Sequence, residues 1–227
     1  MFDPTTIAAV VAKLNELAGG LFLLTAFGLV ATRQVLACLR IYVAQSLLLA
    51  FSALLLGVLY GSVHLVFVAA ITLGIKSILI PRILRRTVGQ DIYARREISQ
   101  SLNIPISLLI SVAIAFVAYA VATPLLAGSA QPYETINLPI GMAGLFLGAY
   151  TIAVRREAVP QLIGILAMEN GAFFAGVSIA PDLPLIAELA AAFDVLIIAL
   201  VMGLLTRKIH EYIGTTAVGE MTSLREE

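Results

Sequence analysis

Long apolar stretches separated by short polar segments dominate the chain. A helix needs about 20 mostly apolar residues to cross the hydrocarbon core of a bilayer. Seven stretches of the 227-residue sequence approach or exceed that length. They cover residues 11–32, 35–59, 62–81, 104–127, 138–154, 158–180 and 185–206. This pattern predicts an all-α fold, a polytopic membrane bundle of about seven transmembrane helices.

Turn and proline signals place several boundaries. Only the segment 59–62 separates the second and third spans, which predicts a tight hairpin there. Pro139 is expected in the first turn of the fifth span, where a proline needs no hydrogen-bond partner, and Pro81 is expected at the inner end of the third. The pattern Gly144-x-x-x-Gly148, with the glycines of the sixth span, predicts close helix packing.

The spans group into four segments along the chain. Residues 1–103 hold three helices and a basic loop, and residues 104–137 hold a connecting fourth helix and an outer loop. Residues 138–208 hold the last three helices, and residues 209–227 form a tail of mixed charge.

Composition narrows the class of protein. Apolar residues make up 60% of the chain and charged residues only 12%, whereas soluble domains are about 25% charged. That excludes an ordinary cytosolic globule, a disordered chain and a basic nucleic-acid binder, so no nucleic-acid partner is expected. The single cysteine, Cys38, permits no internal disulfide, and two distant histidines make no metal site. We therefore expect no metal and no cofactor in this chain.

Basic residues predict the orientation of the bundle. In a seven-span arrangement twelve of them fall on one side, and only Lys13 falls on the other. Because basic loops stay in the cytoplasm, the amino end is expected outside and the carboxyl end inside. The basic loop 82–103 is then either an ordinary cytoplasmic loop or a docking surface for a cytoplasmic partner or anionic lipid.

Ionisable residues within the spans are candidates for function, because burying a charge in a bilayer is costly. His64 and Glu188 are expected near span ends, where this cost is small. Lys76 lies about 7 Å from the expected end of its helix, so it either reaches the interface by snorkelling or serves a function.

Glu169 and Asp194 are expected deeper. Glu169 lies thirteen residues before Asp182, at the centre of the expected turn, and Asp194 lies twelve after it. Both carboxyls then lie about 18–20 Å from that turn, near the midplane, where neither can snorkel. They form either a proton relay or a pair of hydrogen bonds between helices. The predicted relay set is Glu169, Asp194, Lys76 and Glu188, with Asn170 in support as a bridge between carboxyl and water.

The stretch RREAVPQLIGILAMENGAFFAG, residues 155–176, resembles the second helix of the small K subunit of respiratory complex I and of its small counterpart in multisubunit cation/proton antiporters. The whole chain, with Met168-Glu169-Asn170-Gly171 in its sixth span, resembles the hydrogenase-4 component E family. The sequence departs from the complex I subunit at one position. That subunit has its acid two residues after the glycine of Leu-Ile-Gly-Ile, whereas this chain has the apolar Leu166 there and its acid, Glu169, three residues later.

This resemblance implies a membrane subunit of a complex I-like hydrogenase complex in a bacterial or archaeal cytoplasmic membrane. It implies antiporter-like and other membrane subunits as partners, lipid around the bundle, and redox centres in those partners. The chain itself would contribute a path for protons. The alternatives are a subunit of a cation/proton antiporter with no redox partner, and a structural scaffold that seats larger subunits.

Overall fold

The computed structural model describes residues 4–88, 98, 100–126, 132–179 and 200. Its elements are α1 (Pro4–Ala31), α2 (Val35–Tyr60), α3 (Val63–Ile71), the π-helix η1 (Thr72–Leu79), α4 (Ile80–Val88), α6 (Ile104–Leu125), α7 (Pro132–Val154) and α8 (Ala158–Ile179). Six spans in the described residues are long and apolar enough to cross a membrane, with α3, η1 and α4 forming one of them. The prediction of an all-α polytopic bundle is confirmed, and the seventh predicted span, 185–206, lies outside the described residues apart from Leu200.

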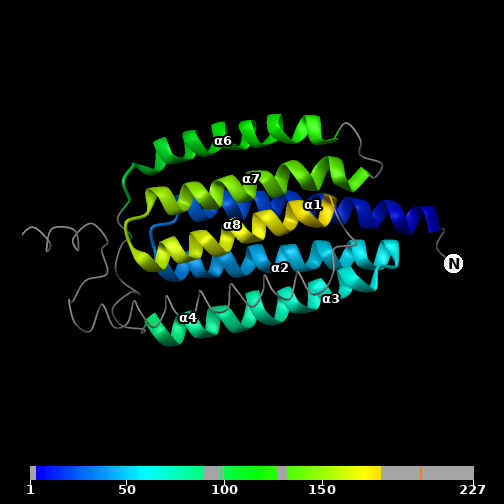
Figure 1. The fold of residues 1–227 in the computed structure, drawn as a ribbon, viewed down its shortest axis with the longest axis horizontal. Helices are drawn as coiled ribbons and strands as arrows, with labels where there is room; N and C mark the ends of the chain where they lie inside the picture. Colours follow the sequence, from blue (N-terminus) through cyan, green and yellow to red (C-terminus); the bar gives the residue numbers. More distant parts are fainter. Residues whose placement is uncertain (1–3, 89–97, 99, 127–131, 180–199, 201–227) are drawn as a thin grey trace, which may run out of the picture.

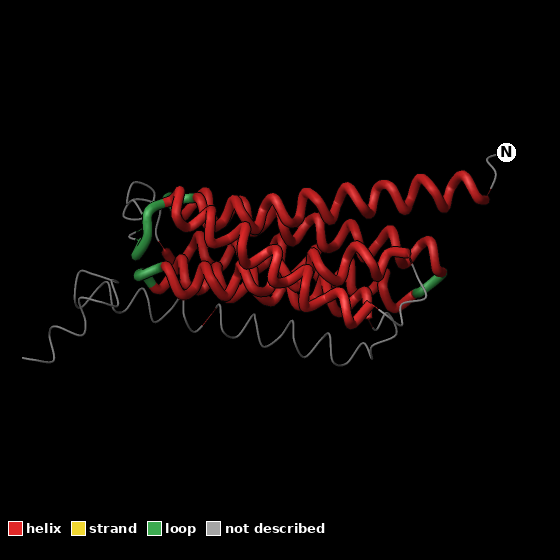
Figure 2. The backbone as a smooth tube through the Cα atoms, turned by 90° about the horizontal axis from the view of Figure 1, so that it is seen from above, coloured by secondary structure: helices red, strands yellow, loops and turns green. Residues whose placement is uncertain are grey.

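The helices lie side by side in an antiparallel bundle (Figure 1). The α7–α8 hairpin has the most extensive contact, and α1 packs against both α2 and α7. α6 covers the outer side of α7, while α3 and η1 cover α2 on the opposite side. Figure 2 shows that α1 projects beyond its neighbours toward the N-terminus.

Two predicted helix starts are wrong. α1 begins at Pro4 instead of residue 11, and α7 begins at Pro132 instead of residue 138. Pro139 therefore lies inside α7 and not in its first turn. The reason is that hydropathy detects contact with the bilayer, whereas the helical hydrogen-bond pattern continues into polar flanking residues.

The third span also differs from expectation, because the helix does not end at Pro81. The chain widens into the π-helix η1 and then continues as α4 to Val88. The π segment ends at Leu79, two residues before Pro81, which has no N–H group to donate to the helix. π segments are rare and often occur at functional sites.

The predicted hairpin at residues 59–62 is confirmed. Gly61 ends α2 with φ 65°, a left-handed conformation that glycine adopts without a steric cost, and its N–H donates to the carbonyl of Gly57. The hydroxyl of Ser62 then accepts from the N–H of Leu65 and caps α3.

Close packing of α7 and α8 through glycine is confirmed. A methyl group at Gly148 would overlap the backbone of Met168, and one at Gly171 would overlap the backbone at Leu145. Gly176 is different, because a methyl group there would meet none of the described residues within 4 Å. Gly176 therefore takes no part in the α7–α8 contact.

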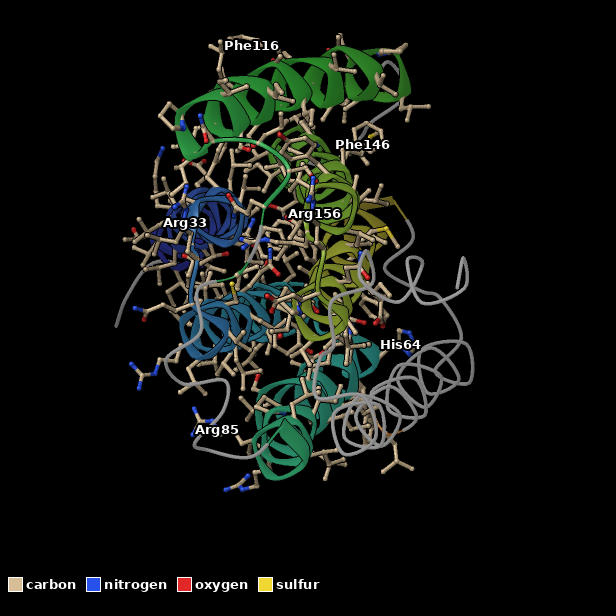
Figure 3. All side chains as sticks on the ribbon, turned by 90° about the vertical axis from the view of Figure 1, so that its left-hand side faces the viewer. Arg33, His64, Arg85, Phe116, Phe146 and Arg156 are labelled. Atoms are coloured by element: carbon tan, nitrogen blue, oxygen red, sulfur yellow. The ribbon has the colours of Figure 1, made fainter. Side chains whose placement is uncertain are left out.

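Described arginines from separate parts of the chain gather at one end of the bundle. Figure 3 looks onto this end, where Arg33 follows α1, Arg85 lies in α4 and Arg156 precedes α8. The predicted grouping of basic residues on one side holds for these three residues. Which side of a membrane this end faces stays a prediction.

Candidate functional site

A buried ion pair joins the third span to α8. Lys76 Nζ lies 2.9 Å from Glu169 Oε1, and the two side chains are 3% and 18% exposed. The same ammonium lies 4.7 Å from the centre of the Phe173 ring, one turn further along α8. Two opposite charges at this distance bury less net charge than either would alone, and the ring face adds a cation–π contact.

The π-helix positions Lys76. The buried residues of η1 are all polar, namely Thr72, Lys76 and Ser77, while its apolar residues Leu73 and Ile78 are exposed. This segment therefore turns a polar face inward, toward α2 and α8. Because the Lys76 side chain is 3% exposed and its ammonium contacts Glu169 inside the bundle, it does not extend toward the helix end as the snorkelling alternative required.

Asn170 ties α8 to α2 beside the ion pair. Its Nδ2 donates to Ser46 Oγ at 2.9 Å and to Gln45 Oε1 at 3.4 Å, and all three side chains are buried. The described hydrogen bonds of Asn170 go to α2, and its predicted role as a bridge between carboxyl and water stays a prediction. These bonds fix the depth and rotation of α8, and so hold Glu169 toward Lys76.

A second buried polar cluster joins α1, α2 and α7. Asn15 Nδ2 donates to Asn137 Oδ1 at 3.0 Å, and Ser52 Oγ donates to Asn15 Oδ1 at 2.6 Å. Each of these side chains is at most 2% exposed. Sequence reasoning missed this cluster because it weighed only ionisable residues; the usable signal was the presence of side-chain amides within apolar spans.

Arg155 holds the arginine end of the bundle together. Its Nη2 donates to the carbonyls of Leu29 and Thr32 at the end of α1, at 2.6 and 2.5 Å. Burial lowers the pKa of this guanidinium, but an arginine stays charged because its ordinary pKa lies far above neutrality. A positive charge at a helix C-terminus is favourable, since unpaired carbonyls gather there.

The structure brings together two of the four predicted relay residues, Lys76 and Glu169. Glu188 and Asp194 lie outside the described residues, so the predicted Glu169–Asp194 pair has no description here. His64 is the second residue of α3 and is half-buried, near the end of its span as expected. In the described part of the chain no group of three His, Cys, Asp or Glu side chains could hold a metal ion.

The groups at this site have the chemistry that proton exchange requires. A carboxylate and an ammonium in contact inside an apolar bundle can each take up or release a proton, and the charge of one group determines which charge its neighbour favours. Side chains of Gln45, Ser46 and Asn170 add donors and acceptors next to the pair. This chemistry suits proton transfer, because it needs titratable groups held within hydrogen-bonding distance.

Comparison with known proteins finds relatives that align over nearly the whole chain. The chain is 30% identical over 210 residues to Uncharacterized protein Rv0085 of Mycobacterium tuberculosis, covering 92% of this chain and 94% of the relative. It is 28% identical over 214 residues to Hydrogenase-4 component E of Escherichia coli, covering 93% and 96%, and equally so to the protein of that name in Shigella flexneri. No family model matches the chain, and no solved structure matches it.

Proposed function

Because the chain belongs to the hydrogenase-4 component E family, we propose that it is a membrane subunit of a hydrogenase complex and carries protons within it. The electron-transferring centres then belong to partner subunits, and antiporter-like subunits lie beside this chain. This chain is the non-catalytic member that supplies titratable groups inside the membrane.

The buried Lys76–Glu169 pair is the observation that carries this proposal. A scaffold could join the third span to α8 with apolar contacts or amides, which cost nothing in charge burial. Buried ion pairs add little to stability compared with well-packed apolar residues, and ionisable groups inside membranes commonly mark ion or proton pathways. A titratable pair at this place therefore favours a role in proton transfer over a purely structural role.

The pair passes a proton by exchanging charge states. A proton that reaches Glu169 neutralises the carboxylate and leaves the Lys76 ammonium facing the ring of Phe173 without an anion beside it. The ammonium then gives up a proton to the next acceptor, after which the neutral amine takes the proton from Glu169 and the starting pair is restored. Asn170 keeps the two groups in contact through its bonds to α2.

Substitution of Glu169 tests this mechanism in the assembled complex. Glu169→Gln keeps the shape and hydrogen bonding but removes titration, so we expect assembly to persist and proton-coupled turnover to fall several-fold. The measurements are hydrogenase activity and proton movement in membrane vesicles, normalised to assembled complex. Glu16→Gln is the matched control, because Glu16 pairs with Lys13 on the surface, and it should behave as wild type.

Two other outcomes separate the alternatives. Full coupled activity in both Glu169→Gln and Lys76→Met would mean that the pair is structural, and the scaffold function would then be preferred. Copurification of this chain with antiporter-like subunits but without hydrogenase subunits would favour a cation/proton antiporter.

We also expect Asp194→Asn to lower coupled turnover, and its combination with Glu169→Gln to add little, since elements of one path are not additive.

A further inference from the structure

The buried face of α2 alternates between polar and apolar layers. Ser46, Leu49 and Ser52 lie three residues apart and are all buried, so they follow one another along one face of the helix. Ser46 belongs to the layer of the Lys76–Glu169 pair, and Ser52 belongs to the Asn15–Asn137 cluster. The two serines are six residues apart, which separates the polar layers by about 9 Å along the bundle.

A compact apolar layer fills the space between them. Leu49 packs with Phe22 of α1 and Phe174 of α8, and each is at most 1% exposed. The two rings are stacked with their centres 4.5 Å apart. This apolar layer is dry, because its lining offers water no hydrogen-bonding partner.

The apolar layer lies next to both polar layers. Phe173 packs against it and also lies under the Lys76 ammonium. On the other side, a methyl group built at Gly19 would lie 3.7 Å from Phe174 and 3.8 Å from Asn137 Oδ1. The three layers are therefore contiguous from the ion pair to the amide cluster.

We infer that the Asn15–Ser52–Asn137 cluster is a second station on the proton route of the Lys76–Glu169 pair, and that the layer of Phe22, Leu49 and Phe174 is the barrier between the two stations. This inference rests on the proposed function. Amide and hydroxyl groups do not titrate near neutrality, so the second station conducts by binding water. The route runs away from the end where Arg33 and Arg156 lie.

Such a barrier would prevent protons from leaking past the pair. A proton moves along a continuous chain of hydrogen bonds, and hydrophobic constrictions interrupt such a chain by excluding water. A shift of α8 against α1 that separates the stacked rings would let water join the two stations. The layer then blocks passive flow and passes protons only in the conformation that turnover produces.

Passive proton leak through the assembled complex tests the barrier without turnover. Leu49→Ser puts a hydroxyl and extra space into the apolar layer, and we expect resting vesicles to dissipate an imposed pH gradient about threefold or more faster than wild type, because the constriction can then hold water. Leu138→Ser is the matched control, since Leu138 is 3% exposed but packs between Ala122 and Ala175. It should not leak.

Second-site changes identify the route of the leak. Ser52→Ala in the Leu49→Ser background should return the leak toward wild type by removing a group of the second station, and Glu169→Gln should do the same at the first. Ser111→Ala is the control for the hydroxyl, because Ser111 is buried on α6 and bonds the Ser107 carbonyl of its own helix. Phe22→Leu is a milder opening of the same layer if Leu49→Ser prevents assembly.

Two results would overturn the inference. One is an assembled Leu49→Ser or Phe22→Leu complex that leaks no faster than Leu138→Ser. The other is a leak that persists unchanged when Ser52→Ala is added. Neither result contradicts the proposed function, which is tested separately by coupled turnover in Glu169→Gln with the apolar layer intact.

Discussion

At the scale of single residues, the bundle buries charged and amide groups in sets that contact one another across helices. Lys76 and Glu169 neutralise one another, and Asn170 bonds across to Ser46 on α2. Each set joins helices that are distant in the sequence. The cost of placing polar groups in an apolar interior is thereby offset by contacts that hold the helices in register.

The ion pair predicts a specific pattern of stabilities. Lys76→Met alone leaves a buried carboxylate without its cation, and a broken buried pair costs about 3–5 kcal/mol. Glu169→Gln leaves the ammonium beside an amide oxygen that still accepts a hydrogen bond, so its loss of stability should be smaller. Lys76→Met/Glu169→Gln removes both charges, so we expect the double variant to melt at a higher temperature than either single variant. The check is thermal unfolding of the complex in detergent.

Additive stability losses in these single and double variants would contradict the expectation. If the double variant lost as much stability as the two single losses summed, the two groups would be independent. The 2.9 Å contact would then contribute nothing to the fold.

At the scale of elements, glycine determines how closely α7 and α8 approach. Gly141, Gly148 and Gly171 leave no room for a methyl group, because each faces backbone atoms of the neighbouring helix. Such packing replaces the hydrophobic drive that is missing between helices in lipid. It also brings Asn170 and Glu169 of α8 close enough to reach α2 and η1.

Two alanine substitutions on α8 should therefore have opposite effects. Gly171→Ala forces the two helices apart and should sharply reduce assembled complex, because overpacking costs about 1–3 kcal/mol or more. Gly176→Ala meets no described atom within 4 Å and should be neutral or slightly stabilising, since alanine favours helix by about 1 kcal/mol over glycine. Quantifying the subunit in membranes and its melting temperature distinguishes the two, and equal behaviour would contradict the close α7–α8 contact.

At the scale of the whole molecule, the ends of the bundle are chemically different. Arg155 is buried and bonds the last carbonyls of α1, and the exposed Arg156 donates to Ser101. The opposite end carries the tight turn at Gly61. Basic loops are retained in the cytoplasm, so this asymmetry predicts the orientation.

Cysteine labelling tests the orientation with one probe at each end. In a Cys38→Ala background, which removes the buried native thiol, Arg156→Cys and Tyr60→Cys place single thiols at exposed positions. An impermeant maleimide added outside intact cells should label Tyr60→Cys, and should label Arg156→Cys only after the membrane is opened. The reverse pattern would invert the orientation.

Some features of the candidate site can be predicted from the sequence, and others depend on the tertiary structure. Glu169 and Lys76 could be singled out from the sequence, because a charge inside an apolar span has a large cost wherever the span packs. Their contact could not, since it depends on the π-helix η1 and on the rotation of α8. The sequence also places Asp194 at the depth of Glu169, because antiparallel counting compares depth; Asp194 lies outside the described residues, so that pairing stays a prediction.

The sequence by itself determined the class of fold, the six spans within the described residues and the gathering of arginines at one end. Those features follow from local quantities, namely the length of apolar runs and the spacing of basic residues. Only the tertiary structure decided that Lys76 faces Glu169, that Asn15, Ser52 and Asn137 meet, and that an apolar layer separates the two sets. These depend on which faces of α1, α2, η1, α7 and α8 turn toward one another, and helix rotation is set by packing between residues more than a hundred positions apart.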